Sequence, residues 1–75
     1  MKEKEVMKRL YEEYTESLEK LMKRIEAVDG EQKKYHAKSV QYKTLYNRKR
    51  RLMTMYEDTF RWRETVKEYI KSWEK

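Results

Sequence analysis

Residues 7–28 read MKRLYEEYTESLEKLMKRIEAV, and their apolar side chains recur at alternating intervals of four and three residues. The recurring positions are Met7, Tyr11, Tyr14, Leu18, Leu21, Ile25 and Val28. This heptad pattern is typical of an α-helix that packs along its length against another helix. An outward acidic ridge repeats every seven residues, at Glu5, Glu12, Glu19 and Glu26. We therefore expect a first helix over about residues 3–28.

The only glycine of the chain, Gly30, follows this helix in the sequence Asp29-Gly30-Glu31-Gln32. Glycine readily adopts the left-handed conformation that ends many helices, and Asp29 followed by Gln32 resembles a capping box. These residues predict a tight turn over 29–31 and a second helix over about residues 32–74. The two helices would form an antiparallel hairpin, as a single domain over residues 1–75.

The second helix continues the same alternation and carries additional apolar stripes on both flanks. Its inner positions are Tyr35, Lys38, Tyr42, Leu45, Lys49, Leu52, Tyr56, Thr59, Arg63, Val66, Ile70 and Trp73. One flank carries Tyr46, Met53 and Phe60, and the other carries Met55, Trp62 and Tyr69. One partner helix cannot cover a face of this width, and about fifteen residues of the longer second helix would extend beyond the first.

Two arrangements would bury this surface. The favoured one is a homodimer of hairpins in a four-helix bundle. Its expected interface consists of Tyr42, Leu45, Leu52, Met53, Tyr56, Phe60, Trp62, Val66, Tyr69, Ile70 and Trp73. The alternative is a three-helix bundle with a break near residues 54–59, where Thr54 and Glu57 resemble a second capping box.

Composition excludes several classes of function. The 75 residues include no cysteine and a single histidine, His36, which argues against disulfides, thiolate metal sites and cysteine nucleophiles. With one glycine there is no phosphate-binding loop, and no catalytic combination of side chains is present. We expect no enzyme activity, no cofactor, no metal and no small-molecule substrate. No apolar run is long enough to span a membrane, and a cytoplasmic location is expected, in the host cell if the protein is viral.

The charge distribution suggests a partner. Residues 33–51 contain eight lysines and arginines, and no acidic residue occurs between Gln32 and Tyr56. Such a stretch matches the phosphate row of DNA or RNA. The candidate contacts are Lys33, Lys34, Lys43, Arg48, Arg50 and Arg51. A solvated face that neutralises the acidic ridge of the first helix would give the same pattern.

The chain is therefore expected to be a small dimeric regulator that binds nucleic acid with weak sequence preference. A second hypothesis is an adaptor or inhibitor of the kind that phage, plasmid or archaeal-virus genomes encode. It would dock on a host protein through the bundle surface, or through an incompletely buried end that bears Trp62 and Trp73. A third is a scaffold in a larger assembly. In their heptads and single turn, the two helices resemble ROP-type hairpins, which pair into antiparallel four-helix bundles and bind RNA. A resemblance in fold does not transmit function.

Overall fold

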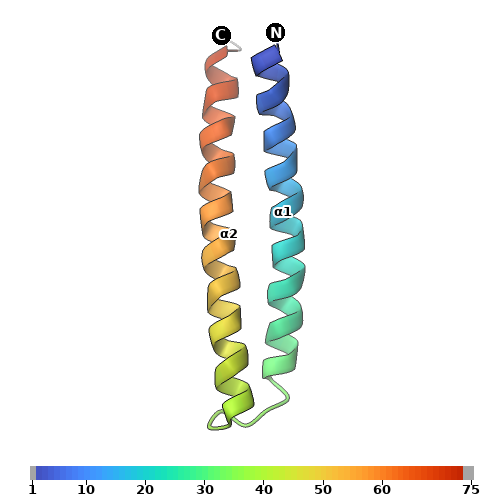
Figure 1. Ribbon diagram of the computed structural model, residues 1–75, viewed down its shortest axis with the longest axis vertical. Helices are drawn as coiled ribbons and strands as arrows, with labels where there is room; N and C mark the ends of the chain where they lie inside the picture. The colour runs from blue at the N-terminus through green and yellow to red at the C-terminus, as the bar shows by residue number, and fades with distance from the viewer. Residues whose placement is uncertain (1, 74–75) are drawn as a thin grey trace.

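The computed structural model describes residues 2–73 and consists of two long helices joined by one loop. Helix α1 spans Lys2–Gln32 and helix α2 spans Val40–Trp73. They run antiparallel, so that the beginning of α1 and the end of α2 lie at one end of the molecule and the loop at the other (Figure 1). The result is a rod of 54 × 15 × 14 Å. The hairpin expected from the heptads is confirmed.

The predicted heptad positions form the contact between the two helices. Leu18, Leu21 and Val28 of α1 and Val66 of α2 are buried, and Leu18 is only 4% exposed. The remaining inner positions from Met7 to Ile25 and from Tyr42 to Ile70 are at least half-buried, whereas the acidic ridge of α1 is exposed as expected. The interval of four and three therefore identified the inner face of both helices.

The turn lies later in the chain than Gly30 predicts. Helix α1 continues through Gly30, which does not adopt a left-handed conformation, and ends at Gln32. A glycine inside a helix costs about 1 kcal/mol relative to alanine, which the surroundings can offset. The next heptad position, Gln32, is buried at 3% exposure, and the Lys33 amide donates to the Asp29 carbonyl at 3.2 Å. The turn over 29–31 and the capping box of Asp29 and Gln32 were therefore wrong.

The loop over residues 33–39 ends at a different cap, Ser39. The Ser39 hydroxyl accepts a hydrogen bond from the Tyr42 amide at 3.1 Å, and it donates one to the His36 carbonyl at 2.7 Å. The Lys38 amide donates to His36 Nδ1 at 3.1 Å, so the histidine helps to shape the loop. A serine that satisfies the third amide of a helix is a standard start signal. Because of it, Tyr35 and Lys38 lie outside α2 and not on its inner face as predicted.

The loop also changes the lengths of the helices. With 31 and 34 residues, α1 and α2 are nearly matched, so the predicted overhang of α2 does not occur. Helix α2 runs without a break through residues 54–59, and the Thr54 hydroxyl donates to the Arg50 carbonyl at 3.1 Å inside the helix. The three-helix alternative is therefore wrong. The predicted end of the second helix at residue 74 lies outside the described residues.

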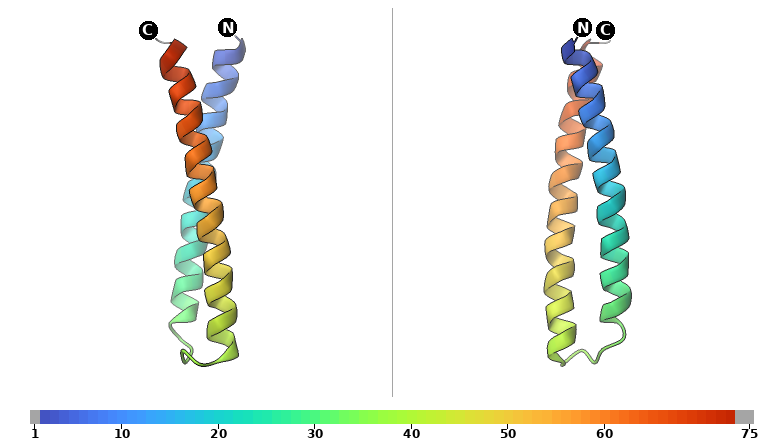
Figure 2. Two further views of the ribbon diagram at one scale, coloured as in Figure 1. Left: turned by 90° about the vertical axis from the view of Figure 1, so that its left-hand side faces the viewer. Right: turned by 45° about the vertical axis from the view of Figure 1, so that its right-hand side comes forward.

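Two sides of α2 remain open because one helix cannot cover its apolar face. We call them the Trp62 side, with Met55, Trp62 and Tyr69, and the Phe60 side, with Tyr46, Met53 and Phe60. All six side chains are exposed by 40% or more. Two further views show the two helices side by side, and no third element of residues 2–73 lies over either flank (Figure 2). The predicted width of the apolar face is confirmed.

Candidate nucleic-acid interface

Charge is distributed unevenly along the length of the hairpin. We define the loop half as residues 17–56, which brings the second part of α1 beside the first part of α2. This half holds eleven basic and four acidic residues, a net charge of +7, and the remaining residues hold nine basic and ten acidic residues, a net charge of −1. Together they account for the net charge of +6. Folding thus concentrates the positive charge at one end of the rod.

Four predicted phosphate contacts lie on the outside of α2 in this half. Lys43, Arg48, Arg50 and Arg51 are all exposed, and none has an ion-pair partner within residues 2–73. Lys43 and Arg50 are seven residues apart, so they share one ridge at a separation of about 10 Å. Arg48 lies on the Trp62 side. The structure leaves these four cations available to a ligand.

The other two predicted contacts, Lys33 and Lys34, lie in the loop and not in the first turn of a helix. Lys33 Nζ pairs with Asp29 Oδ2 at 3.0 Å, and Lys34 Nζ lies 3.8 Å from Glu31 Oε1. Both lysines are more than 70% exposed, and exposed ion pairs are worth little. Phosphates could therefore displace these acids, but Lys33 and Lys34 offer less net charge than the four cations of α2.

Lys49 has a structural role. Its heptad position required the amine to find a partner, and Lys49 Nζ pairs with Asp29 Oδ1 on the other helix at 3.1 Å. The amine also lies 5.9 Å from the centre of the Tyr46 ring, and the side chain is 22% exposed. Hydrogen bonds from Lys33, and then from Lys49, hold the pKa of Asp29 below its usual value. Lys49 therefore joins the two helices at the loop end.

The aromatic side chains of the loop half divide between the inner face and the surface. Tyr42 and Tyr56 are half-buried at heptad positions, as expected of a tyrosine stripe at helical spacing. Tyr46 is exposed on the same flank as Lys43 and Arg50, and Tyr35 is exposed in the loop. Two tyrosines could thus stack on unpaired bases beside cationic side chains.

Three basic residues of α1 belong to the same half of the molecule, although the basic stretch 33–51 does not include them. They are Lys20, Lys23 and Arg24, all exposed. Arg24 and Arg48 line one open groove between the helices, of about 530 Å³. An antiparallel pairing of the two heptad patterns could have predicted this neighbourhood. A count of charged residues along the sequence could not have predicted it, because α1 as a whole is not basic.

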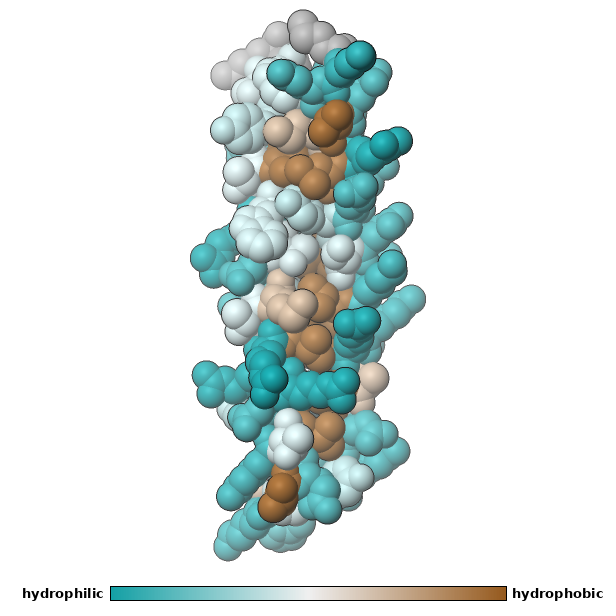
Figure 3. Space-filling view, viewed as in Figure 1, coloured by the Kyte–Doolittle hydropathy of each residue, from teal (hydrophilic) through white to brown (hydrophobic). Residues whose placement is uncertain are grey.

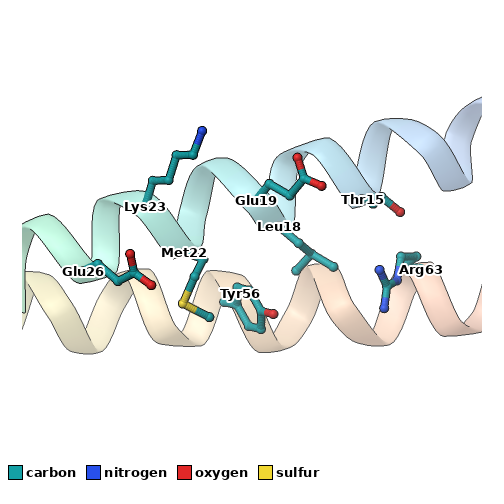
Figure 4. Close-up of a pocket in the computed structure, with 8 residues that line it drawn as sticks. All are labelled: Thr15, Leu18, Glu19, Met22, Lys23, Glu26, Tyr56 and Arg63. Atoms are coloured by element: carbon teal, nitrogen blue, oxygen red, sulfur yellow. The ribbon is translucent and has the colours of Figure 1, made fainter.

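A second groove opens on the other flank and is lined mainly by α1. Its volume is about 470 Å³, and Leu18 and Met22 of α1 point toward Tyr56 of α2 across it, while Lys23 points away (Figure 4). Arg63 closes one end, with its guanidinium 5.5 Å from the Tyr11 ring and 5.2 Å from the Phe60 ring. Its Nε is buried without a hydrogen-bond partner. Thr15, which also lines this groove, donates its hydroxyl hydrogen bond to the Tyr11 carbonyl at 2.9 Å.

The surface in Figure 3 carries apolar side chains in a band between the helices, and hydrophilic side chains reach across this band in the half nearer the loop. Over residues 2–73, no three His, Asp or Glu side chains gather as a cation site. In the same residues, neither helix has an apolar stretch long enough to cross a membrane. No family model matches the chain, and no curated protein or solved structure is significantly similar to it.

Proposed function

We propose that the protein is a non-catalytic regulator that binds DNA or RNA through the loop half of its hairpin. The observation that supports this proposal is the group Lys43, Arg48, Arg50 and Arg51, exposed and without ion-pair partners in a half that carries a net charge of +7. If the basic stretch served only to neutralise the acidic ridge of α1, these side chains would pair with it. The ion pairs of this half that the described residues form are instead made by Lys33, Lys34 and Lys49.

The proposed binding is electrostatic. Each lysine or arginine that neutralises a phosphate of a duplex releases counterions, and the logarithm of affinity falls with the logarithm of salt concentration by about 0.9 per contact. Four contacts then predict a loss of roughly 100-fold between about 50 and about 200 mM salt. Contacts to phosphates position a protein without reading bases, so weak sequence preference is expected.

The working form is proposed to be a homodimer in a four-helix bundle. Two helices alone leave Met53, Phe60, Trp62 and Tyr69 exposed, and an apolar surface of this extent on a small protein usually belongs to an interface. Other residues of the expected interface already face α1. Leu45, Leu52, Tyr56 and Ile70 are half-buried there, and Val66 is buried. In a bundle these would form the centre, with the exposed side chains of one flank in contact with the second copy.

Fluorescence anisotropy with a mixed-sequence duplex and a single-stranded RNA, each at several salt concentrations, tests the binding. Reversal of Arg50 and Arg51 to Glu should abolish it and leave helicity unchanged. The matched control reverses Arg61 and Lys71, which are also exposed on α2 but lie in the other half. It changes the net charge equally and should retain most of the affinity. Absent or salt-insensitive binding at about 50 mM salt, or equal losses in both variants, would contradict the proposal.

A further inference from the structure

The apolar side chains of the Trp62 side are more exposed than those of the Phe60 side. Met55, Trp62 and Tyr69 follow one another at intervals of seven residues and are 51%, 56% and 54% exposed. The Trp62 ring lies near Tyr14 of α1, and the centres of the two rings are 6.3 Å apart. The stripe is also symmetric in sequence, because Met55 and Tyr69 lie equally far from Trp62 in opposite directions.

The margins of the two open sides differ. At the outer edge of the Phe60 side, the next heptad position is occupied by charged residues on both helices. They include Glu12, Glu19 and Glu26 on α1 and Lys43, Arg50 and Glu57 on α2. Next to the Trp62 side, the equivalent positions are mixed: Val6, Ala27, Thr44, Thr65 and Ser72 are uncharged, and Glu13, Lys20, Arg51 and Asp58 are charged. Burial of charged side chains carries a desolvation penalty, and this penalty is larger for a margin that is charged throughout than for a mixed one. The Trp62 side is therefore the better surface for association.

We infer that a second copy of the chain docks on the Trp62 side in antiparallel orientation, with the two-fold axis at Trp62. This inference rests on the proposed dimer and specifies its face and direction. A two-fold axis at this position places the two Trp62 rings together and Met55 of each copy opposite Tyr69 of the other, so the apolar stripe is self-complementary. A parallel dimer would instead place two halves of charge +7 side by side.

The size of this contact is sufficient for a specific complex of moderate affinity. With the axis at Trp62, residues 51–73 of the two α2 helices overlap, over about 33 Å at 1.5 Å per residue. For a rod 15 Å wide, this gives about 500 Å² per copy, and both copies together reach the roughly 1,000 Å² that specific interfaces require. The loop halves project from opposite ends, and the two loops lie about 75 Å apart, given the 54 Å length of one rod.

Sedimentation equilibrium without nucleic acid tests which side of the hairpin forms the dimer contact. Two variants of α2, each with one aromatic residue replaced by glutamate, are compared. Trp62→Glu should weaken the dimer by about 100-fold or more, because buried aromatic residues dominate interface energies and each dimer loses two. Phe60→Glu is the control: it removes an exposed aromatic side chain two residues away on the other flank and should sediment as wild type. A strictly monomeric wild type, or a dimer disrupted by Phe60→Glu and not by Trp62→Glu, would overturn the inference.

The antiparallel orientation of the two copies can be tested separately, with the Trp62 side unchanged. The chain has no cysteine, so Ala37→Cys in the exposed loop allows one label per copy. Pulsed electron spin resonance should give a distance between the labels longer than the 54 Å rod. A much shorter distance would show a parallel dimer and refute the antiparallel arrangement. Both measurements are independent of nucleic acid, so loss of the proposed binding and failure of this dimer can be told apart.

Discussion

Arg63 is the clearest case in which a stabilising substitution can be worked out from the structure. It occupies an inner heptad position next to the buried Val66, where an apolar side chain would ordinarily lie. Its guanidinium lies over the rings of Tyr11 and Phe60, and its buried Nε has no hydrogen-bond partner. We predict that Arg63→Leu raises the stability of the protein.

The magnitude follows from three contributions. A buried donor without a partner costs about 1–3 kcal/mol, which the substitution relieves. The two contacts between the guanidinium and the rings contribute about 0.5–1 kcal/mol each, and these are lost. A half-buried leucine adds roughly 1 kcal/mol by burial of apolar surface. The middle values of these contributions sum to a net gain of about 1.5 kcal/mol, which corresponds to a rise in Tm of roughly 6–12 °C for a domain of this size.

Thermal unfolding followed by circular dichroism at one fixed protein concentration measures this gain, because the Tm of a protein that associates depends on concentration. The control is Arg61→Leu, two residues away, where the side chain is 76% exposed and only 3.8 Å from Asp58. Its Tm should stay close to that of wild type, since exposed substitutions usually change stability by less than about 0.5 kcal/mol. If Arg63→Leu lowers the Tm while the control does not, the rings stabilise the arginine more than its unpaired Nε destabilises it, and the reasoning fails.

Two further predictions concern the loop end. Ser39→Ala removes the N-terminal cap of α2 and should lower the free energy of unfolding in urea by about 1 kcal/mol. The control, Thr44→Ala in the next turn, should not lower it. Equal urea midpoints for Ser39→Ala and wild type would show that the cap does not contribute to stability. Hydrogen bonds from Lys33 and Lys49 lower the pKa of Asp29 in the folded state, so its contribution is complete above the ordinary value of 3.8 and is lost as the pH falls below it. Asp29→Asn should therefore lower the Tm at neutral pH, and the difference from wild type should shrink in acid; a constant difference would contradict this account.

Much of the fold could be predicted from local patterns. The alternation of four and three residues identifies the inner face of both helices, because any helix that packs along its length must repeat its apolar side chains with this period. The same register correctly placed Lys49 at a position where it needs a partner, and left Lys43, Arg50 and Arg51 on the outside. The candidate phosphate contacts of α2 were accessible to sequence reasoning for this reason.

The position of the turn was not predictable from these patterns. Gly30 and Ser39 are both plausible boundaries, and local propensities differ between them by only about 1 kcal/mol. The choice depends on whether Gln32 can pack against α2 and Asp29 can reach Lys49, and both contacts exist only once the two helices have met. Sequence reasoning therefore misplaced Lys33 and Lys34 and inferred an overhang that does not occur.

The sequence by itself determined that two amphipathic helices form and which side of each faces inward, because a heptad repeat specifies a face irrespective of the partner. Only the tertiary structure decided which residues of α1 lie beside which residues of α2. That pairing makes the two helices nearly equal in length, brings Arg24 and Arg48 to the same groove and concentrates a charge of +7 in one half of the rod. The physical reason is that periodicity specifies rotation about a helix axis, whereas the alignment of two helices along that axis depends on the loop and on contacts between residues distant in sequence.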